Sequence, residues 1–309
     1  MNDRLYNDYG TWIRTKFPYR IQKLAVDAGF SCPNRDGTKG RGGCIFCDNR
    51  TFNPAYCTPH QGVAQQIEAG KRFFARKYPD MKYLAYFQAF TNTYAPLDHL
   101  KRLYEEALTT DGVVGLVIGT RPDCVSPELL DYLATLARQT FLVVEYGIES
   151  TNNQTLRLIN RGHDFECSRL AIEETAARDI MAGGHVIIGL PGENANESLR
   201  QADCISALPL TMLKIHQMQV VRDTALERMF AEQPFHIYTV EEYIELVTEY
   251  VQRLRWSLVL ERFTSQSPKE MLVAPQWGLK NHEFADRLNN HMRAVGARQG
   301  AKCSAHPEL

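Results

Sequence analysis

The chain has 309 residues, of which 44% are hydrophobic and 23% charged, a balance typical of one globular domain or at most two small ones. Its 35 basic and 36 acidic side chains give a net charge of -1, so the chain as a whole would attract neither nucleic acid nor an anionic membrane. No apolar run has the length of a membrane span, and residues 1–12 lack the hydrophobic core of a signal peptide. We therefore expect a cytosolic protein without membrane contact.

The first predicted strand, residues 21–26, is followed by a loop with three closely spaced cysteines. Eleven residues separate Cys32 from Cys44, and two separate Cys44 from Cys47. A C-x-x-C pair lets two thiolates bind one metal centre from a single turn, and the glycines of this loop allow it to bend tightly. The other five cysteines are isolated in the sequence, which is typical of small buried hydrophobic side chains: Cys57, Cys124, Cys167, Cys204 and Cys303. A reducing compartment argues against a disulfide framework.

Two kinds of metal centre fit this loop. A structural zinc site needs a fourth ligand, which Cys57 or His60 could supply. A [4Fe-4S] cluster held by only three thiolates leaves one iron with an open position, which can bind and activate a small molecule. Phe46, directly before the third cysteine, would cover the flank of such a cluster and change its reduction potential. Only one C-x-x-C pair is present, so the sequence favours the cluster.

Strand-like and helix-like segments alternate after the loop. Helices are predicted from Thr58 or Pro59 to Lys77, after Ser126 as N-cap, and over 166–181 and 196–207; strands are predicted at 83–87, 113–118, 141–144, 186–188 and 212–215. Alternation of this kind predicts parallel strands with right-handed crossovers, and six such units predict an α/β fold, a partial (β/α)6 TIM-like barrel.

A small C-terminal α/β extension is predicted after the barrel. It contains a helix over 240–255, an apolar run at 256–260 and an amphipathic stretch over 281–295. We expect residues 1–238 to form the barrel, with the cysteine loop at 32–47, and residues 239–309 to pack on it.

Polar residues at the ends of the predicted strands indicate an active site, because parallel barrels hold their sites at the C-terminal strand ends. A period of two places Glu145, Gly147 and Glu149 on one face of their strand, which should point into the barrel. Their carboxylates would either pair with Arg121 or Arg161 or accept hydrogen bonds from a ribose.

The next two strands offer further candidates. The segment around His185 ends at Gly189, where small residues let the backbone approach a planar ring, although His185 could also be an ordinary core histidine. On the last strand, Lys214, His216 and Met218 share a face, and the first two are candidates for substrate contact.

The cysteine loop, ending in C-x-aromatic-C ahead of repeating strands and helices, resembles the radical S-adenosylmethionine (SAM) superfamily. The family's usual first gap is shorter, and the longer gap here is similar to that of the Elongator catalytic subunit and its relatives. Four segments resemble successive Elongator-type motifs, and the resemblance extends over about residues 20–220: Gly119–Asp123, Gly147–Ser150, Asn160–His163 and Gly189–Gly192. The family's GGE segment is absent, and residues 87–93 take its place.

This resemblance implies an enzyme with a [4Fe-4S] cluster and S-adenosylmethionine, which together generate a 5'-deoxyadenosyl radical. The cluster ligands would be Cys32, Cys44 and Cys47, and the cofactor would be contacted by eight residues: Phe46, Ala89, Phe90, Thr91, Glu149, Arg161, His185 and Gly189. Substrate contacts are expected from Glu145, Arg121, Lys214 and His216. An electron donor such as flavodoxin or ferredoxin is implied. We expect no counterpart of Elongator's acetyltransferase domain.

Elongator-type relatives modify the wobble uridine of tRNA, so the resemblance implies a radical step on that side chain. Residues 1–50 carry a net charge of +4, residues 51–277 one of -7 and residues 278–309 one of +2. The basic residues around the cysteine loop, interleaved with Phe17 and Tyr19, could form a phosphate-contacting rim or an ordinary solvated face: Arg14, Lys16, Arg20, Lys23, Arg35, Lys39 and Arg41. A radical enzyme acting on a small metabolite or tetrapyrrole, or a zinc-stabilised binding protein, remain the alternatives.

Overall fold

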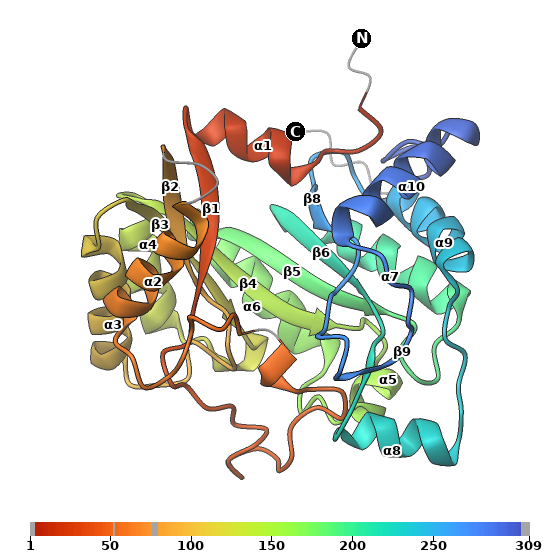
Figure 1. Cartoon of the computed structure of the whole chain (residues 1–309), viewed down its shortest axis with the longest axis horizontal. Helices are drawn as coiled ribbons and strands as arrows, with labels where there is room; N and C mark the ends of the chain where they lie inside the picture. The colour runs from red at the N-terminus through yellow and green to blue at the C-terminus, as the bar shows by residue number, and fades with distance from the viewer. Residues whose placement is uncertain (1–3, 52, 76–79, 304–309) are drawn as a thin grey trace.

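The computed structural model describes residues 4–51, 53–75 and 80–303. Within them, seven parallel strands form one sheet in the order β1-β2-β3-β4-β5-β6-β8, which curls into a half-barrel (Figure 1). The strands are β1 (Arg20–Val26), β2 (Met81–Phe87), β3 (Val113–Thr120), β4 (Phe141–Glu149), β5 (Met181–Ile188), β6 (Met212–Gln217) and β8 (Val259–Arg262). The predicted partial barrel is confirmed, with one strand more than the sequence indicated.

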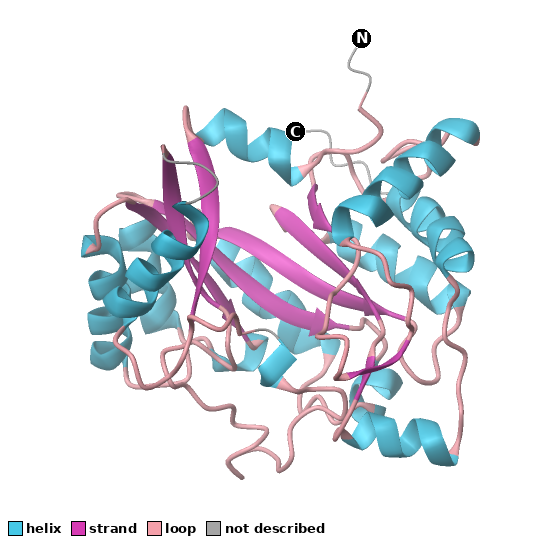
Figure 2. Ribbon diagram, in the orientation of Figure 1, coloured by secondary structure: helices cyan, strands magenta, loops and turns pink. Residues whose placement is uncertain are grey.

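Helices cover the outer face of the curled sheet (Figure 2). They are α2 (Val63–Ala75), α3 (Leu97–Thr109), α4 (Pro127–Ala137), α6 (Phe165–Ala176), α7 (Ala195–Ala207), α9 (Val240–Arg253) and α10 (Asn281–Ala294). Shorter helices lie near the strand ends: η1 (Asn49–Thr51), η2 (Pro122–Cys124), α5 (Asn153–Leu158) and α8 (Ala225–Glu232). The predicted N-cap of α4 is confirmed, since Ser126 accepts a hydrogen bond from Leu129 N at 3.2 Å.

The predicted helix over 166–181 is too long. α6 ends at Ala176, and Met181 already begins β5. Gly183 in that strand faces Glu145 of β4, whose Cγ would lie 2.9 Å from a Cβ at position 183. A glycine-rich segment therefore serves as a strand here, because its neighbour needs the space of a missing side chain. The helix predicted from Thr58 begins at Val63, and Lys77, its predicted end, lies outside the described residues.

The two ends of the chain complete the half-barrel. Helix α1 (Tyr9–Lys16), whose N-cap is Asp8, crosses the N-terminal end of the sheet. The ring of Trp12 packs there against Phe141 of β4, with 6.1 Å between the ring centroids. The C-terminal extension does more than pack on the barrel, because its strand β8 pairs with β6. A small antiparallel pair, β7 (Val220–Val221) and β9 (Leu272–Ala274), lies beside the main sheet. None of the described helices is long and apolar enough to cross a membrane.

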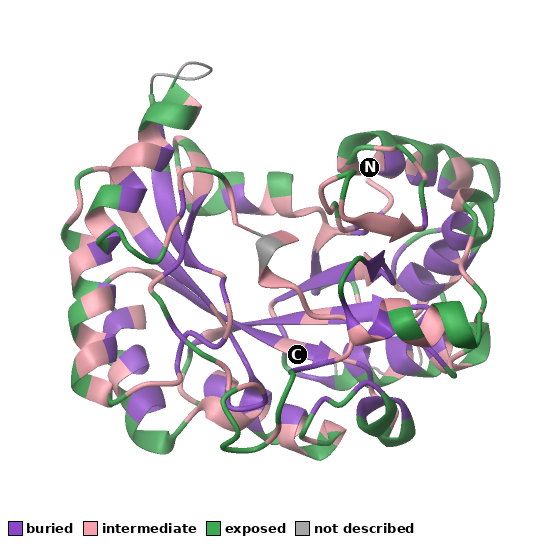
Figure 3. Ribbon diagram, turned by 60° about the horizontal axis from the view of Figure 1, so that its bottom comes forward, coloured by how far each residue is buried: buried purple, intermediate pink, exposed green. Residues whose placement is uncertain are grey.

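Burial follows the predicted alternation of the strands. On β4, Val144, Tyr146 and Ile148 are fully buried in the hydrophobic layer between sheet and helices. The strands are the most deeply buried part of the fold, and the outward faces of the helices are exposed (Figure 3). The opposite face of β4 is polar, and it points into the hollow of the half-barrel.

Candidate active site

A cavity opens at the C-terminal ends of the strands. It encloses about 1320 Å³, counted with the open solvent at its mouth. Cys32, Cys44 and Cys47 all line it, together with Phe46. The structure thus brings the three spaced cysteines of the loop to one wall of the cavity, at the edge where a parallel barrel holds its site.

The loop after β1 is held in shape by its own backbone. Arg35 N and Asp36 N both donate to the carbonyl of Cys32, and Cys47 N donates to that of Cys44 at 3.0 Å. Asn34 ties the loop to the barrel through a 2.5 Å hydrogen bond from Nδ2 to the carbonyl of Asn160. Two tight turns therefore bring the thiols to the cavity wall.

Nitrogen donors surround the thiols. Arg161 Nη1 lies 3.5 Å from Cys44 Sγ, and Asn34 Nδ2 lies 3.9 Å from the same sulfur. Asn49 Nδ2 lies 3.9 Å from Cys47 Sγ. Burial and the neighbouring Cys44 raise the pKa of the Cys47 thiol to about 11, so a metal would have to displace a proton there. Donors aimed at sulfur stabilise cluster thiolates and tune their potential, so these residues fit a [4Fe-4S] centre.

The adjoining wall joins β4 to the segment after α5. Arg161 Nη2 lies 3.6 Å from Glu149 Oε1 and also donates to the carbonyl of Gly147. A Cβ at Gly147 would lie 2.5 Å from Glu149 Oε1, so only glycine leaves these two side chains in place. Glu149 and Phe90, both lining the cavity, have left-handed backbones with φ of 65° and 60°. Strain of this kind in non-glycine residues is typical of functional sites.

A buried network of charges forms the floor of the cavity. Glu145 is 1% exposed and binds Lys214 at 2.6 Å and Lys23 at 3.2 Å, and it is 2.9 Å from His185 Nε2. Glu261 of β8 binds Lys23 at 2.6 Å. Burial alone would raise the pKa of Glu145, but Lys214 and Lys23 hold it well below its usual range. Glu145 is therefore ionised at neutral pH.

Comparisons with known proteins agree with this geometry. Residues 36–201 match the family model described as "Radical SAM superfamily", and residues 210–294 match that of the "Radical_SAM C-terminal domain". The chain belongs to the radical SAM superfamily. YtqA of Bacillus subtilis (strain 168) is 32% identical over 298 residues, which are 96% of this chain and 92% of YtqA.

Two further matches, one in sequence and one in structure, are to longer chains. The tRNA uridine(34) acetyltransferase of Methanocaldococcus infernus is 26% identical over 190 residues, which are 60% of this chain. The match spans about a third (34%) of that enzyme's length. The solved structure of M. infernus Elp3, with an N-terminal deletion, superposes with a TM-score of 0.70 and 18% identity, covering 91% of this chain and 64% of that one. This likeness in fold confirms the expected partial barrel.

Membership of the radical SAM superfamily settles the class of the protein. It is an enzyme whose cofactors are a [4Fe-4S] cluster and S-adenosylmethionine, and such enzymes need a reductant. The alternative of a zinc-stabilised binding protein is therefore wrong. The two residues considered as a fourth zinc ligand lie in other settings: Cys57 donates to Gln66 Oε1 at 3.1 Å, and His60 is exposed.

Most of the predicted cofactor residues of this radical SAM enzyme meet at the cavity. Phe46, Phe90, Thr91, Glu149, Arg161 and His185 line it, and Thr91 Oγ1 has no hydrogen-bond partner among the described residues. Ala89 is buried and Gly189 packs against Tyr238, so neither of these two lines the cavity.

Of the four predicted substrate residues, three line the cavity and one does not. Arg121, Glu145 and His216 line the cavity, whereas Lys214 is 3% exposed and lies below its floor. The expected ion pair with an arginine is correct for Glu149 with Arg161 but wrong for Glu145, whose partners are two lysines and His185. Arg121 instead pairs with Asp123 at 2.8 Å.

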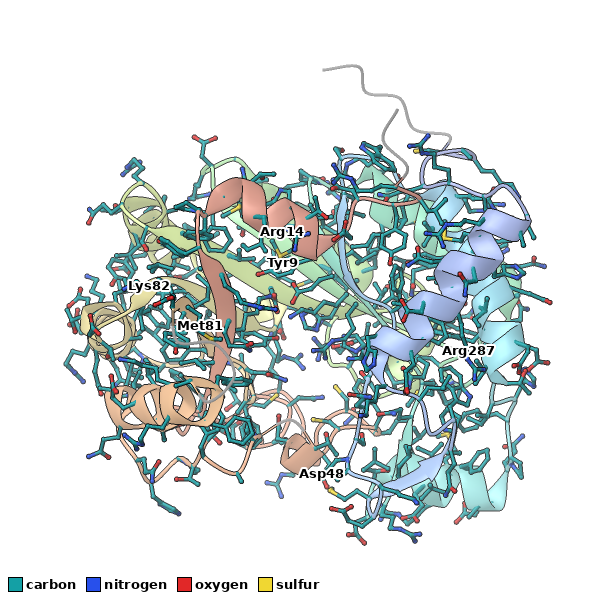
Figure 4. All side chains as sticks on the ribbon, turned by 45° about the horizontal axis from the view of Figure 1, so that its top comes forward. Tyr9, Arg14, Asp48, Met81, Lys82 and Arg287 are labelled. Atoms are coloured by element: carbon teal, nitrogen blue, oxygen red, sulfur yellow. The ribbon has the colours of Figure 1, made fainter. Side chains whose placement is uncertain are left out.

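The predicted basic rim is not a single surface. Arg14 on α1 and Arg20 at the start of β1 lie at the N-terminal end of the sheet, as does Lys16, whereas Asp48, next to Cys47, lies at the opposite end (Figure 4). Lys23 is buried in the charge network. Only Arg35, Lys39 and Arg41 remain near the cysteines, and Lys39 is bound to Asp123 at 2.7 Å.

The remaining cysteines are unlinked. None of the eight forms a disulfide. Cys57 is buried, as expected of an isolated cysteine. Cys204 is exposed, so that expectation is wrong for it, and Cys124, Cys167 and Cys303 are only partly buried.

Several residues of the site were not predicted from the sequence. Asn34 and Asn49 each lie two positions after a cysteine of the loop, and that proximity was a usable signal; Arg35 was assigned only to the basic rim. Arg262 and Ser265 come from the extension, and no local pattern in the sequence places them at the cavity.

Proposed function

We propose that this radical SAM enzyme modifies the side chain of the wobble uridine in tRNA. The observation that carries the proposal is the 26% identity over 190 residues to a tRNA uridine(34) acetyltransferase. Those residues make up 60% of this chain, and the family model that the chain matches, over residues 36–201, includes Cys44, Cys47 and the strands β2 to β5. A shared site of this kind supports a shared substrate class.

The residues of the cysteine loop and their neighbours would hold the cluster. Cys32, Cys44 and Cys47 would hold the cluster, with Arg161 and Asn34 as donors to Cys44 Sγ. When bound, the cluster and S-adenosylmethionine supply the one-electron chemistry that attacks an unactivated C–H bond. Flavodoxin or ferredoxin would be the reductant.

The protein's own contribution is position and the exclusion of water. Glu149 and Arg161, fixed against Gly147, would bind the polar groups of the cofactor. His185, held by Glu145 at 2.9 Å, would lie beside its adenosine. A cofactor filling this cavity would leave little room for water, which limits side reactions of a reactive species.

The decisive experiment compares tRNA nucleosides from cells with and without the gene by mass spectrometry. We expect a wobble-uridine derivative to be lost, to return with the wild-type protein or Cys124→Ala, and to stay absent with Cys44→Ala. An unchanged nucleoside profile would instead favour a small metabolite or tetrapyrrole as the substrate. Binding of purified tRNA should weaken steeply with salt, and a flat response would count against an RNA substrate.

A further inference from the structure

Among the described residues, four arginines line the cavity, and one of them differs from the rest. Arg35, Arg121 and Arg161 each donate to a backbone carbonyl, and the last two also face a carboxylate. The side chain of Arg262 has no hydrogen bond or ion pair with any residue that the structure describes, and its guanidinium is not fully buried. Its donors are therefore available to a ligand.

A β-bulge directs Arg262 into the cavity. Leu213 of β6 pairs with Leu260 of β8, but the next residue of β6, Lys214, pairs with Arg262, so that Glu261 is the extra residue. Lys214 faces the interior of the half-barrel, where it binds Glu145. Because residues paired across a ladder share a face, the bulge gives Arg262 the same inward direction.

The charge of Arg262 is not balanced by its surroundings. In the floor network, Lys23 and Lys214 are matched by Glu145 and Glu261, all of them in mutual contact. The positive charge of Arg262 therefore has no matching carboxylate in this network, and it faces the cavity.

The wall around Arg262 is otherwise neutral. Gln219 Oε1 accepts from Ser267 at 2.8 Å, and Gln217 Oε1 accepts from Ser265 N at 2.6 Å. Burial, followed by electrostatic repulsion from the neighbouring His185 and Arg262, holds the pKa of His216 well below its usual range, so this histidine is uncharged at neutral pH. A ligand that entered here would meet one cation and no competing carboxylate from this wall.

We propose that Arg262 binds an anionic group of the substrate, a carboxylate or a phosphate, through its planar pair of N–H donors. This inference rests on the proposed function for the identity of that group, which on a tRNA would be a carboxylate on the uridine side chain or a backbone phosphate. The carboxylate of S-adenosylmethionine is a different source of the same chemistry. The residues expected to hold that cofactor lie on or after β1, β2, β4 and β5, whereas Arg262 lies on the edge strand β8.

The test measures binding to the reconstituted enzyme in four forms: wild type, Arg262→Gln, Arg262→Lys and the control Arg287→Gln, which alters an exposed arginine of α10. The probes are S-adenosylmethionine and two anticodon stem-loop RNAs that differ only in having uridine or 5-carboxymethyluridine at the wobble position. If Arg262 binds a carboxylate, the wild type prefers the acidic RNA, and Arg262→Gln weakens that RNA alone, about ten- to a hundredfold. If it binds a phosphate, the variant weakens both RNAs equally.

Arg262→Lys should recover part of the loss, because it keeps the charge but not the planar fork. Arg287→Gln should behave as wild type. Weaker binding of S-adenosylmethionine with unchanged RNA binding would assign Arg262 to the cofactor and overturn the proposal. RNA binding that is the same in wild type and Arg262→Gln would also overturn it.

A second measurement separates this proposal from the proposed function. Phenylglyoxal labelling of the holoenzyme, resolved by peptide mass spectrometry, should modify Arg262, and acetate or inorganic phosphate should protect it. If no RNA binds the wild type but this protection is seen, the RNA assignment fails and the anion site stands. Absence of both RNA binding and protection would refute both proposals.

Discussion

Replacing Glu145 by glutamine should destabilise the chain strongly, although the shape of the side chain is kept. The substitution leaves two lysines on the cavity floor with one carboxylate, Glu261, between them. Lys23 keeps a 2.6 Å partner, but Lys214 exchanges a contact of 2.6 Å for one of 3.6 Å, at 3% exposure. Loss of a partner from a buried ion pair costs about 3–5 kcal/mol. Because Glu261 still neutralises part of the charge, we expect the free energy of unfolding to fall by about 3 kcal/mol, the lower end of this range.

Urea unfolding of the metal-free chain measures this change through the transition midpoint. The double variant Glu145→Gln with Lys214→Met restores neutrality and should regain at least half of the loss, as a double-mutant cycle would show. Glu166→Gln, which removes an exposed partner of Arg169, is the matched control and should leave the midpoint unchanged. A loss below about 1 kcal/mol for Glu145→Gln, or no recovery in the double variant, would refute the view that this network is a balanced buried charge cluster.

Three further predictions concern the cofactors and acid stability. Cys44→Ala should lose the iron bound on anaerobic reconstitution and the cleavage of S-adenosylmethionine, whereas Cys124→Ala should keep both, and equal losses would show the ligand assignment to be wrong. Gly147→Ala places a methyl 2.5 Å from Glu149 Oε1, so cofactor binding in equilibrium dialysis should weaken about tenfold while the circular dichroism stays the same. Burial and the nearby Arg161 lower the pKa of His163 to about 3, so the folded chain cannot take up the proton that an unfolded histidine binds below about pH 6.5. Stability should therefore fall on acidification, by about 1.4 kcal/mol between about pH 7.5 and 5.5 for this group, and the urea midpoint of His163→Asn should depend less on pH over that range.

The features that the sequence predicted correctly depend on neighbours along the chain. The cap at Ser126, the alternation along β4 and the spacing of the cysteine loop are each visible within a few residues. The polar face of β4 was correctly directed into the cavity because helices cover the other side. By contrast, the helix predicted over 166–181 ran into β5, since the reason for glycine at position 183 is the side chain of Glu145, 38 positions earlier.

The partners of buried charges could not be predicted in this way. Lys23 was assigned to a solvated rim, yet its carboxylates come from β4 and β8, 122 and 238 positions along the chain. Local sequence shows the charge of a lysine but not whether a curled sheet encloses it. The same limit concealed Arg262, whose direction depends on one bulge between β6 and β8.

These long-range contacts also explain how a half-barrel can be closed at one end and open at the other. β1 and β8 are the two edges of the sheet and form no ladder with each other in the described residues. Lys23 of β1 nevertheless binds Glu261 of β8 at 2.6 Å, and Asp8, which caps α1, forms a bridge with Leu260. Ion pairs and α1 thus join the edges on the N-terminal side, where a hydrogen-bonded strand would otherwise be needed. Beyond this junction the described residues form no such link between the edges, and the cysteine loop after β1 and the bulged end of β8 both line the open cavity. The charge network is therefore the structural condition for an active site whose cluster wall and substrate wall belong to opposite edges of one sheet.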